Sequence, residues 1–496
     1  MRDFEVLLRE SLPENAASAL MDVLGAGSSS AEVSIRLNPL KASDFAFDFD
    51  MRPVPWCKDA FFLPERPNFT LDPSFHAGAY YVQDSSSMFP ALVADKILDS
   101  LSGVYSGGSD GAVLDLCASP GGKSTHLISI VKDLSPVVVC NEAVGKRVPP
   151  LTDNIAKWGA GNVVVTNASA ASLGKAEGFF DVILADVPCS GEGMFRKSVD
   201  AVEGWSLNSV KDCATLQRSI ISDVWPALRE GGLLIYSTCT YNHFENQDNV
   251  KYIAEELEAD FVPVDEEELA SVPGVVKLPW GYQFVPGLVP GEGQFFAVLR
   301  KKSSGNRRFE NKSRRSVKGR KARFIALEGT ESGDRLVLDR ENNQVYLLQD
   351  SKVYARELEF ANWISDINPS CVKTLGCRVG EIKAGKIIPD ADLALSLALS
   401  GAESGHFSVN PSGGGKVSAL DFSCAEIDRE TALKFLSREN ITPQPSWPRG
   451  YILLRYRSLG IGFVNNLGNR SNNLHPLHRR IINKAQSARP IRPHTP

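Results

Sequence analysis

Five short apolar runs between residues 110 and 240 limit the possible folds of this chain more than any other feature. The runs are "AVLDL" (112–116), "VVVCN" (137–141), "NVVVT" (162–166), "FDVILAD" (180–186) and "LLIYST" (233–238). Each is apolar almost throughout, which is typical of parallel strands that are buried on both faces. Helical stretches, such as 147–158 and 213–229, lie between them. This alternation predicts a doubly wound α/β sheet, with "QFFAVLRK" (294–301) as a late antiparallel strand.

The ends of these strands are where a site is expected. Ligands of doubly wound sheets bind beyond the carboxyl ends of the parallel strands. Those ends carry polar or reactive residues in every case. They are Asp115–Lys123, Glu142, Asn167–Ser169, Asp186–Cys189 and Thr238–Thr240.

The first strand end, "DLCASPGGKSTHL", resembles a phosphate-binding loop but departs from it. A P-loop requires a glycine five residues before Gly122, and Cys117 holds that place. The two glycines still let the backbone approach a ligand closely at the start of a helix. Glu142 follows the second strand, where an acid suits two ribose hydroxyls. We therefore expect a nucleoside cofactor rather than nucleotide hydrolysis.

Two cysteines point to a methyl transfer that proceeds through a covalent intermediate. Cys189 lies in "ADVPCSGEGM" and Cys239 in "YSTCTY". Cytosine C5 is a poor nucleophile, but addition of a thiolate at C6 creates an enamine whose C5 attacks an electrophilic methyl group. The reaction also needs an acid near N3 and a base for the C5 proton. Asp186, Cys189 and Cys239 meet these needs, although spacing does not say which thiol attacks, and free cysteines are often only small buried side chains.

These residues carry a family resemblance. The chain resembles Nop/Sun-type RNA cytosine-5 methyltransferases, which use S-adenosylmethionine and have a Rossmann-like methyltransferase sheet with an N-terminal α+β subdomain. The resemblance covers about residues 30–301, and its motifs occur in the family's order. They are "IRLNPLK" (35–41), "YYVQDSSSM" (80–88), "DLCASPGGKSTHL", "NEAVGKRVPPLTDNIAKWGAGNVVVTN" (141–167), "ADVPCSGEGMFRK", "LQRSIISDVWPALREGGLLIYSTCTYNHFENQDNV" and "GEGQFFAVLRK".

The resemblance implies a role for each site residue. Cys239 would be the nucleophile, Cys189 would assist breakdown of the adduct, and Asp186 and Lys123 would complete the catalytic set. Lys123 would lie by the target base or Asp186, the alternative being a surface lysine at a helix start. The cofactor would contact Cys117, Ala118, Ser119, Pro120, Gly121, Gly122, Lys123, Glu142, Arg147, Ser169 and Asp186. Arg147 is either a support for Glu142 or a surface residue, and Ser169 stands where the family usually has an acid.

The C-terminal part carries a second, shorter resemblance. The segments "GCRVGEIKAGKIIPDADLALSLAL" (376–399) and "GYILLRYRSLGIGFVNNLGN" (450–469) resemble the extension of the bacterial ribosomal RNA subgroup, whose last segment is a β-rich, PUA-like RNA-binding region. Asn465 replaces an expected lysine. The alternative is a generic β-rich accessory domain. The resemblance implies RNA as partner, with ribosomal RNA in a ribosomal subunit or its precursor favoured over transfer RNA.

Charge divides the chain into segments. Between residues 300 and 323 there are twelve Lys or Arg and one acid, within a chain of net charge −5. Such a run is typical of a flexible basic linker, either a plain tether or an arm that binds RNA phosphates. We expect an N-terminal RNA-binding subdomain (1–105), a methyltransferase domain (106–301), a linker (302–323), an accessory domain (324–440), a PUA-like region (441–482) and a basic tail (483–496).

The remaining composition excludes several classes of protein. The nine cysteines form no Cys-x-x-Cys pair, so we expect no disulfide framework and no metal site, and a reducing cytoplasm. The remaining six, Cys57, Cys140, Cys213, Cys371, Cys377 and Cys424, are interpreted as packing residues. The start of the chain resembles an amphipathic helix, and we expect neither a signal peptide nor a membrane span. An RNA-binding protein that kept the fold but lost activity, and an amino-group methyltransferase, remain as alternatives.

Overall fold

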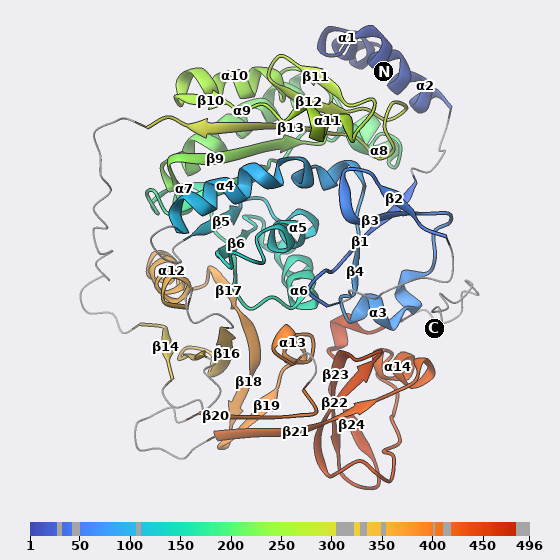
Figure 1. Ribbon diagram of the computed structural model, residues 1–496, viewed down its shortest axis with the longest axis vertical. Helices are drawn as coiled ribbons and strands as arrows, with labels where there is room; N and C mark the ends of the chain where they lie inside the picture. Colours follow the sequence, from blue (N-terminus) through green and yellow to red (C-terminus); the bar gives the residue numbers. More distant parts are fainter. Residues whose placement is uncertain are drawn as a thin grey trace.

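The structure of the protein is a computed structural model that describes residues 1–26, 32–41, 50–105, 111–303, 322–327, 335–348, 354–399, 402–409 and 418–482. At its centre lies a sheet with five parallel strands (Figure 1). They are β5 (Ala112–Asp115), β6 (Val137–Asn141), β7 (Val163–Thr166), β8 (Phe180–Asp186) and β9 (Leu228–Thr238). Their order is β9-β8-β5-β6-β7, so the chain winds outward from β5 in both directions. This confirms the predicted doubly wound sheet.

Antiparallel strands extend the sheet beyond β9. In order from β9 these are β13 (Gln294–Lys301), β12 (Gly281–Phe284) and β11 (Val276–Leu278), and β10 (Ala259–Phe261) pairs with the far part of β13. The register places Phe295 of β13 opposite Thr238 of β9. The expected late antiparallel strand over 294–301 is therefore confirmed.

The bounds of one helix and one strand differ from those expected from the sequence by several residues. The helix expected over 213–229 is α9 (Leu207–Val224), which begins and ends several residues earlier. Its start is fixed by a capping box, in which Ser206 and Ser209 each accept from the backbone N–H of the other. A 3-10 turn, η5 (Trp225–Ala227), follows because Pro226 cannot continue the helix. Strand β9 then begins at Leu228, earlier than the expected residue 233, because Leu228 pairs with Phe180 before a bulge in the ladder.

Both faces of the sheet are covered by helices, which explains why the strands are apolar throughout. One face packs on η2 (Ser86–Val93), α4 (Ala94–Tyr105), α5 (Gly122–Ile130) and α6 (Val148–Trp158). The opposite face packs on α7 (Ala170–Gly174), α9 and α10 (Gln247–Glu256). Successive residues alternate between the two cores, as Val113 and Leu114 do. Smaller helical segments are η3 (Gly145–Arg147), η4 (Glu192–Met194), α8 (Val199–Glu203) and α11 (Glu266–Ala270).

The N-terminal part consists of two helices and a small sheet. Helices α1 (Arg2–Ser11) and α2 (Glu14–Gly25) join the core cluster on the α9 and α10 side of the large sheet. Strands β1 (Val33–Leu37), β2 (Arg52–Val54), β3 (Cys57–Leu63) and β4 (Tyr80–Val82) form an antiparallel sheet of order β2-β3-β1-β4. The short elements η1 (Phe69–Leu71) and α3 (Pro73–His76) lie between β3 and β4. This arrangement agrees with the expected α+β subdomain.

The C-terminal part forms a second large sheet of order β14-β15-β16-β18-β19-β21-β22-β23-β24, with β20 paired to β21. Its strands are β14 (Phe324–Ala326), β15 (Arg335–Asp339), β16 (Gln344–Leu348), β18 (Cys377–Lys383), β19 (Lys386–Pro389), β20 (Ser404–Val409), β21 (Ser418–Glu426), β22 (Gly450–Tyr456), β23 (Leu459–Asn466) and β24 (Ser471–Asn473). Its helical segments are α12 (Tyr354–Ile367), α13 (Ala391–Ala394), η6 (Leu397–Leu399), α14 (Arg429–Leu436) and η7 (Leu477–Arg479).

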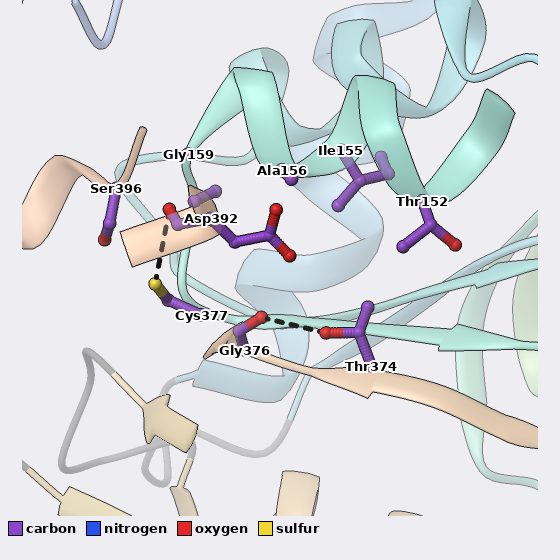
Figure 2. Close-up of a pocket in the computed structure, with 10 residues that line it drawn as sticks. Thr152, Ile155, Ala156, Gly159, Thr374, Gly376, Cys377, Asp392 and Ser396 are labelled. Atoms are coloured by element: carbon purple, nitrogen blue, oxygen red, sulfur yellow. Dashed lines mark hydrogen bonds between the residues drawn. The ribbon is translucent and has the colours of Figure 1, made fainter. Parts of the chain in front are cut away.

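One C-terminal strand joins the catalytic sheet. Strand β17 (Val372–Leu375) pairs antiparallel with β7 and completes that edge. Figure 2 shows the small cavity where α6 meets the chain from β17 to α13, with Thr152 and Ile155 on one side and Thr374 and Cys377 on the other. Nearby, Arg479 bonds both Asp153 of α6 and Asp392 of α13. The C-terminal part is thus packed directly against the doubly wound sheet and its helices.

Both ends of the basic run between residues 300 and 323 are folded. Arg300 and Lys301 lie in β13, and Lys301 Nζ donates to the carbonyl oxygens of Trp225 and Leu228. At the other end, Arg323 forms an ion pair of 2.7 Å with Asp339. The basic residues between 304 and 321, and the predicted tail 483–496, lie outside the described residues. Among the helices that the structure does describe, none is long and apolar enough to span a membrane.

Asn141 ties three strand ends together. Its Nδ2 donates to the carbonyl oxygens of Leu116 and Ala168, each at 3.0 Å. Its Oδ1 accepts from Thr166 Oγ1 at 2.8 Å and from the backbone N–H of Ala168 at 2.9 Å. The side chain is buried, so all four bonds form away from water. Asn141 directly precedes Glu142 and so fixes where that acid leaves the sheet.

The Asn141→Ala variant should therefore be markedly less stable. It loses four buried hydrogen bonds and leaves their partners unpaired, which should lower the free energy of unfolding by about 2–4 kcal/mol. Calorimetry should show a midpoint of thermal unfolding several degrees lower than in the wild type. Asn208→Ala, at an exposed position of α9, is the matched control. Equal midpoints for both variants would show that the amide network does not hold the strand ends.

Candidate active site

Three acids meet at the carboxyl edge of the parallel strands. Asp115 ends β5, Glu142 follows β6 and Asp186 ends β8. Asp115 is fully buried, and its Oδ2 accepts from Ser124 Oγ at 2.6 Å. Its Oδ1 is buried and accepts no hydrogen bond. Burial, more than the nearby carboxylates, raises the pKa of Asp115 to about 7.

The predicted cofactor loop passes between the first two acids. Gly121 has a φ of 110°, a left-handed conformation that glycine adopts without strain, and α5 begins directly after it. A side chain on Gly122 would approach the Tyr81 ring to 3.4 Å. The backbone of the loop therefore lies close to an aromatic ring of the N-terminal sheet, with little room for larger residues.

Arg147 connects this loop to Glu142. Its Nη2 donates to the carbonyl oxygen of Ser119 at 2.8 Å, and Ser119 Oγ donates to the carbonyl oxygen of Arg147 at 2.7 Å. The guanidinium also lies 3.4 Å from Glu142 Oε2. Of the two alternatives for Arg147, the geometry favours a support for Glu142, although half of the side chain is exposed.

Glu142 retains a free acceptor. Its side chain is almost completely buried, and Oε1 accepts from the backbone N–H of Val144 at 2.8 Å. Oε2 accepts no hydrogen bond within the described residues. This oxygen has the Arg147 ion pair but no hydrogen bond, and a buried carboxylate oxygen without one is costly unless a ligand donates to it. Two ribose hydroxyls of a nucleoside would satisfy it.

An open cleft lies beside the loop. It contains about 590 Å³ of empty space, part of which is open to solvent. Its walls come from the N-terminal sheet, the cofactor loop and the ends of β5 and β8. They include Tyr81, Gln83, Asp84, Asp115, Cys117, Ala118, Ser119, Pro120, Gly122, Lys123 and Asp186. The cleft thus brings together most of the predicted cofactor residues.

Lys123 and Asp186 form an ion pair at the floor of this cleft. Lys123 Nζ lies 2.9 Å from Asp186 Oδ2, and the lysine side chain is only 13% exposed. Burial lowers the pKa of Lys123, but the Asp186 carboxylate outweighs it and leaves this pKa above its usual value. The alternative of a surface lysine therefore does not fit this geometry. Ser237 Oγ donates to the other carboxylate oxygen, Oδ1, at 2.7 Å.

The two cysteines lie side by side. Cys189 Sγ and Cys239 Sγ are 2.9 Å apart, and both are free thiols. The backbone N–H of Gly193 donates to the carbonyl oxygen of Cys239 at 2.8 Å, which joins the two loops. The hydrogen bond with Cys239, together with burial and the nearby Glu245, raises the pKa of Cys189 well above its usual value. The surroundings of Cys189 therefore disfavour its thiolate form.

Two buried glutamates that the sequence analysis did not select support this thiol pair. Glu245 accepts from the backbone N–H of Ser190 at 3.0 Å, from Gln217 Nε2 at 2.7 Å and from Asn242 Nδ2 at 2.8 Å. Glu192 accepts from the backbone N–H of Tyr241 at 2.7 Å, and burial raises its pKa to about 7. Each glutamate comes from one cysteine loop and bonds the other. The sequence feature that could have pointed to Glu245 is the polar run "TYNHFENQD" (240–248), which follows Cys239 at the end of a buried strand.

Ser169 and the other cysteines lie apart from this chemistry. Ser169 caps α7, where its Oγ accepts from the backbone N–H of Ser172 at 3.2 Å. Its contact with adenine stays a prediction. Cys57, Cys140, Cys371 and Cys377 are buried, and Cys213 and Cys424 are half-buried, in agreement with packing roles. Across the described part of the chain, no three His, Cys, Asp or Glu side chains gather closely enough to hold a metal ion.

Comparisons with known proteins show which families the chain resembles. Models of three families match the chain. They are "16S rRNA methyltransferase RsmB/F" (residues 107–300), "N-terminal domain of 16S rRNA methyltransferase RsmF" (residues 2–85) and "Methyltransferase RsmF PUA domain" (residues 422–481). Together they cover the N-terminal part, the central sheet and the last strands of the C-terminal sheet, but not residues 301–421.

Individual relatives extend the match over the whole chain. The ribosomal RNA small subunit methyltransferase F of Photobacterium profundum is 27% identical over 489 residues, or 95% of each chain. That of Escherichia coli O9:H4 is 34% identical over 315 residues, or 60% of this chain and 62% of the relative. A solved methyltransferase homolog from Pyrococcus horikoshii aligns with a TM-score of 0.44 and 23% identity, over 60% of this chain and 93% of its own. The central part of the chain, residues 107–300, belongs to the RsmB/F family of 16S rRNA methyltransferases, and the chain carries the N-terminal and PUA domains of RsmF.

Proposed function

We propose that the protein methylates C5 of a cytosine in small-subunit ribosomal RNA, through a covalent bond between Cys239 Sγ and C6 of the base. Membership of a ribosomal RNA methyltransferase family supports the substrate class and implies S-adenosylmethionine as the methyl donor. One observation carries the finer proposal. Two free thiols lie 2.9 Å apart beside a partly buried Lys123–Asp186 ion pair, at one edge of the sheet.

The residues of the cleft suit a cationic nucleoside cofactor. S-adenosylmethionine supplies an electrophilic methyl group when bound. The backbone of the loop from Cys117 to Lys123 would lie against it, and Glu142 Oε2 would accept from its ribose hydroxyls. The orphaned Oδ1 of Asp115 offers a second acceptor at the same edge. The carboxylates at this edge of the sheet also favour binding of the cofactor, whose sulfonium sulfur is positively charged, over binding of the product, whose sulfur is uncharged.

The two thiols would act in sequence. The Cys239 thiolate adds to C6, and the electron pair moves through the ring toward N3, where Asp186 and Lys123 stabilise the charge. C5 would then take the methyl group as the bond between that group and the sulfonium sulfur breaks and the cofactor leaves as a neutral thioether. A base would remove the C5 proton, and the C6–S bond would break to restore the ring and the thiolate. Because its pKa is raised, Cys189 is poorly suited to attack as a thiolate, which leaves the later step as its role. Lys123 supplies the cation that favours a thiolate at Cys239.

The substrate must present an unstacked base. A thiolate attacks C6 from the face of the ring, so the target cytosine is single-stranded or flipped out of its helix. The PUA domain matched at residues 422–481 supports RNA as the partner, and a ribosomal subunit or its precursor is the expected assembly. The basic segment between 304 and 321 would add contacts to phosphates.

Glu142→Ala should weaken cofactor binding. The variant loses the acceptor for two ribose hydroxyls, and one hydrogen bond to a charged group contributes about 1.5–3 kcal/mol, which corresponds to roughly tenfold or more in Kd. Isothermal titration with S-adenosylmethionine measures the change. Glu177→Ala, at an exposed position before β8 and so at the opposite edge of the sheet, should bind like the wild type. An unchanged Kd for Glu142→Ala would place the ribose elsewhere.

The cysteine variants should separate the two thiol roles. Cys239→Ala should neither methylate RNA nor form a covalent complex. Cys189→Ala should still add and methylate but fail to release, and so accumulate a protein–RNA band in denaturing electrophoresis. The double variant should show no band, because addition precedes release. Cys213→Ala, in α9, is the control for loss of a half-buried thiol. If Cys239→Ala instead formed the covalent protein–RNA band and Cys189→Ala did not, Cys189 would be the nucleophile and Cys239 the residue that assists release.

A further inference from the structure

A buried glutamine contacts both members of the catalytic ion pair. Gln294 Nε2 donates to Asp186 Oδ1 at 3.1 Å, and Gln294 Oε1 lies 3.4 Å from Lys123 Nζ. The same Nε2 donates to the carbonyl oxygen of Thr238 at 2.8 Å. Thr238 directly precedes Cys239, so one amide contacts the acid, the cation and the backbone of the proposed nucleophile.

The position of Gln294 in the sheet accounts for these contacts. It is the first residue of β13, which runs antiparallel to β9 with Phe295 opposite Thr238. The residue therefore enters the site from the antiparallel side, whereas Asp186 and Cys239 come from the ends of parallel strands. Its side chain is only 3% exposed and cannot exchange these bonds for water.

The orientation of the amide follows from its surroundings. Two oxygen acceptors, from Asp186 and Thr238, face one end of the amide, and the Lys123 ammonium faces the other. The reverse orientation would set an oxygen against two oxygens and an NH₂ group against a cation. The NH₂ group must therefore face Asp186, and it favours the ionised form of that carboxylate.

We propose that Gln294 is a positioning residue for this reaction. This inference rests on the proposed function. It holds the Asp186 carboxylate and the Lys123 ammonium in one fixed arrangement beside Cys239, and its NH₂ group stabilises the charge on Asp186. Ser237 supplies the second donor to Oδ1, and Lys123 faces Oδ2, so the carboxylate is held on all sides. Gln294 itself neither donates a proton nor forms a bond to the substrate.

The test compares pH profiles of single-turnover methylation at saturating S-adenosylmethionine. Gln294→Leu removes the donor, and Gln294→Glu keeps the shape but sets a second carboxylate beside Asp186. Gln283→Leu is the matched control, since Gln283 is equally buried on the neighbouring strand β12 and bonds Asn246 and the carbonyl oxygen of Phe284 instead. The other titratable groups near Asp186 and Lys123 are Asp115, Cys117 and Cys239, which are unchanged in all variants.

The acid limb of the profile should move to higher pH in Gln294→Leu and further in Gln294→Glu, because two adjacent carboxylates hold a proton more tightly than one. The rate at pH 7 should fall about tenfold or more in both, as expected for loss of a hydrogen bond to a charged group. Gln283→Leu should keep the acid limb of the wild type. If Gln294→Leu does not fold, the acid limb of Gln294→Glu alone tests the proposal.

Two results would overturn the proposal in distinguishable ways. If the wild type forms 5-methylcytosine and all four proteins share one acid limb, Gln294 has no positioning role and the proposed function stands. If nucleoside analysis of the wild-type product finds no 5-methylcytosine, the proposed function fails and the role of Gln294 fails with it.

Discussion

The parallel pairing of four strands is the constraint on which the rest of this protein depends. Because β5, β6, β8 and β9 run in one direction, Asp115, Glu142, Asp186 and Cys239 all emerge at the same edge, although more than a hundred residues separate the first from the last. Hydrophobic burial on both faces holds the strands in this order. The Asn141 amide then fixes the ends of β5, β6 and the neighbouring strand β7 relative to one another. Without this shared edge the acids would be scattered surface groups.

The second requirement is that two identical side chains behave differently. Cys189 and Cys239 lie in contact, yet their surroundings differ in charge. Glu245, held by Ser190, Gln217 and Asn242, lies near Cys189, whereas the Lys123 ammonium acts on Cys239. A negative neighbour disfavours a thiolate and a positive one favours it. The division of roles that the family resemblance implies therefore has a physical counterpart in these two charges.

The sequence predicted those parts of the protein that depend on local pattern. Continuous apolar runs indicated buried parallel strands, and the position of Asp186 and the two cysteines at strand ends indicated where they would meet. Gln294 was not selected, because it lies within an ordinary strand pattern and becomes important only when β13 pairs with β9. Strand β17 could not be expected at the edge of the catalytic sheet, because its pairing with β7 spans about two hundred residues and a basic segment. The start of β9 differed from the expected residue 233 for a similar reason, because its first residue, Leu228, is fixed by pairing with Phe180.

The central claim is that Cys239 Sγ bonds the target base. A 5-fluorocytosine in the RNA tests it directly, because fluorine cannot leave C5 as a cation and elimination is blocked after methyl transfer. The trapped wild-type protein is digested with protease and nuclease, and the peptide that carries the nucleotide is sequenced by mass spectrometry. The account predicts a modified peptide that contains Cys239, with the mass of a methylated fluorocytidine nucleotide. Attachment at Cys189, or no covalent product from an RNA whose unmodified form is methylated at C5, would contradict it.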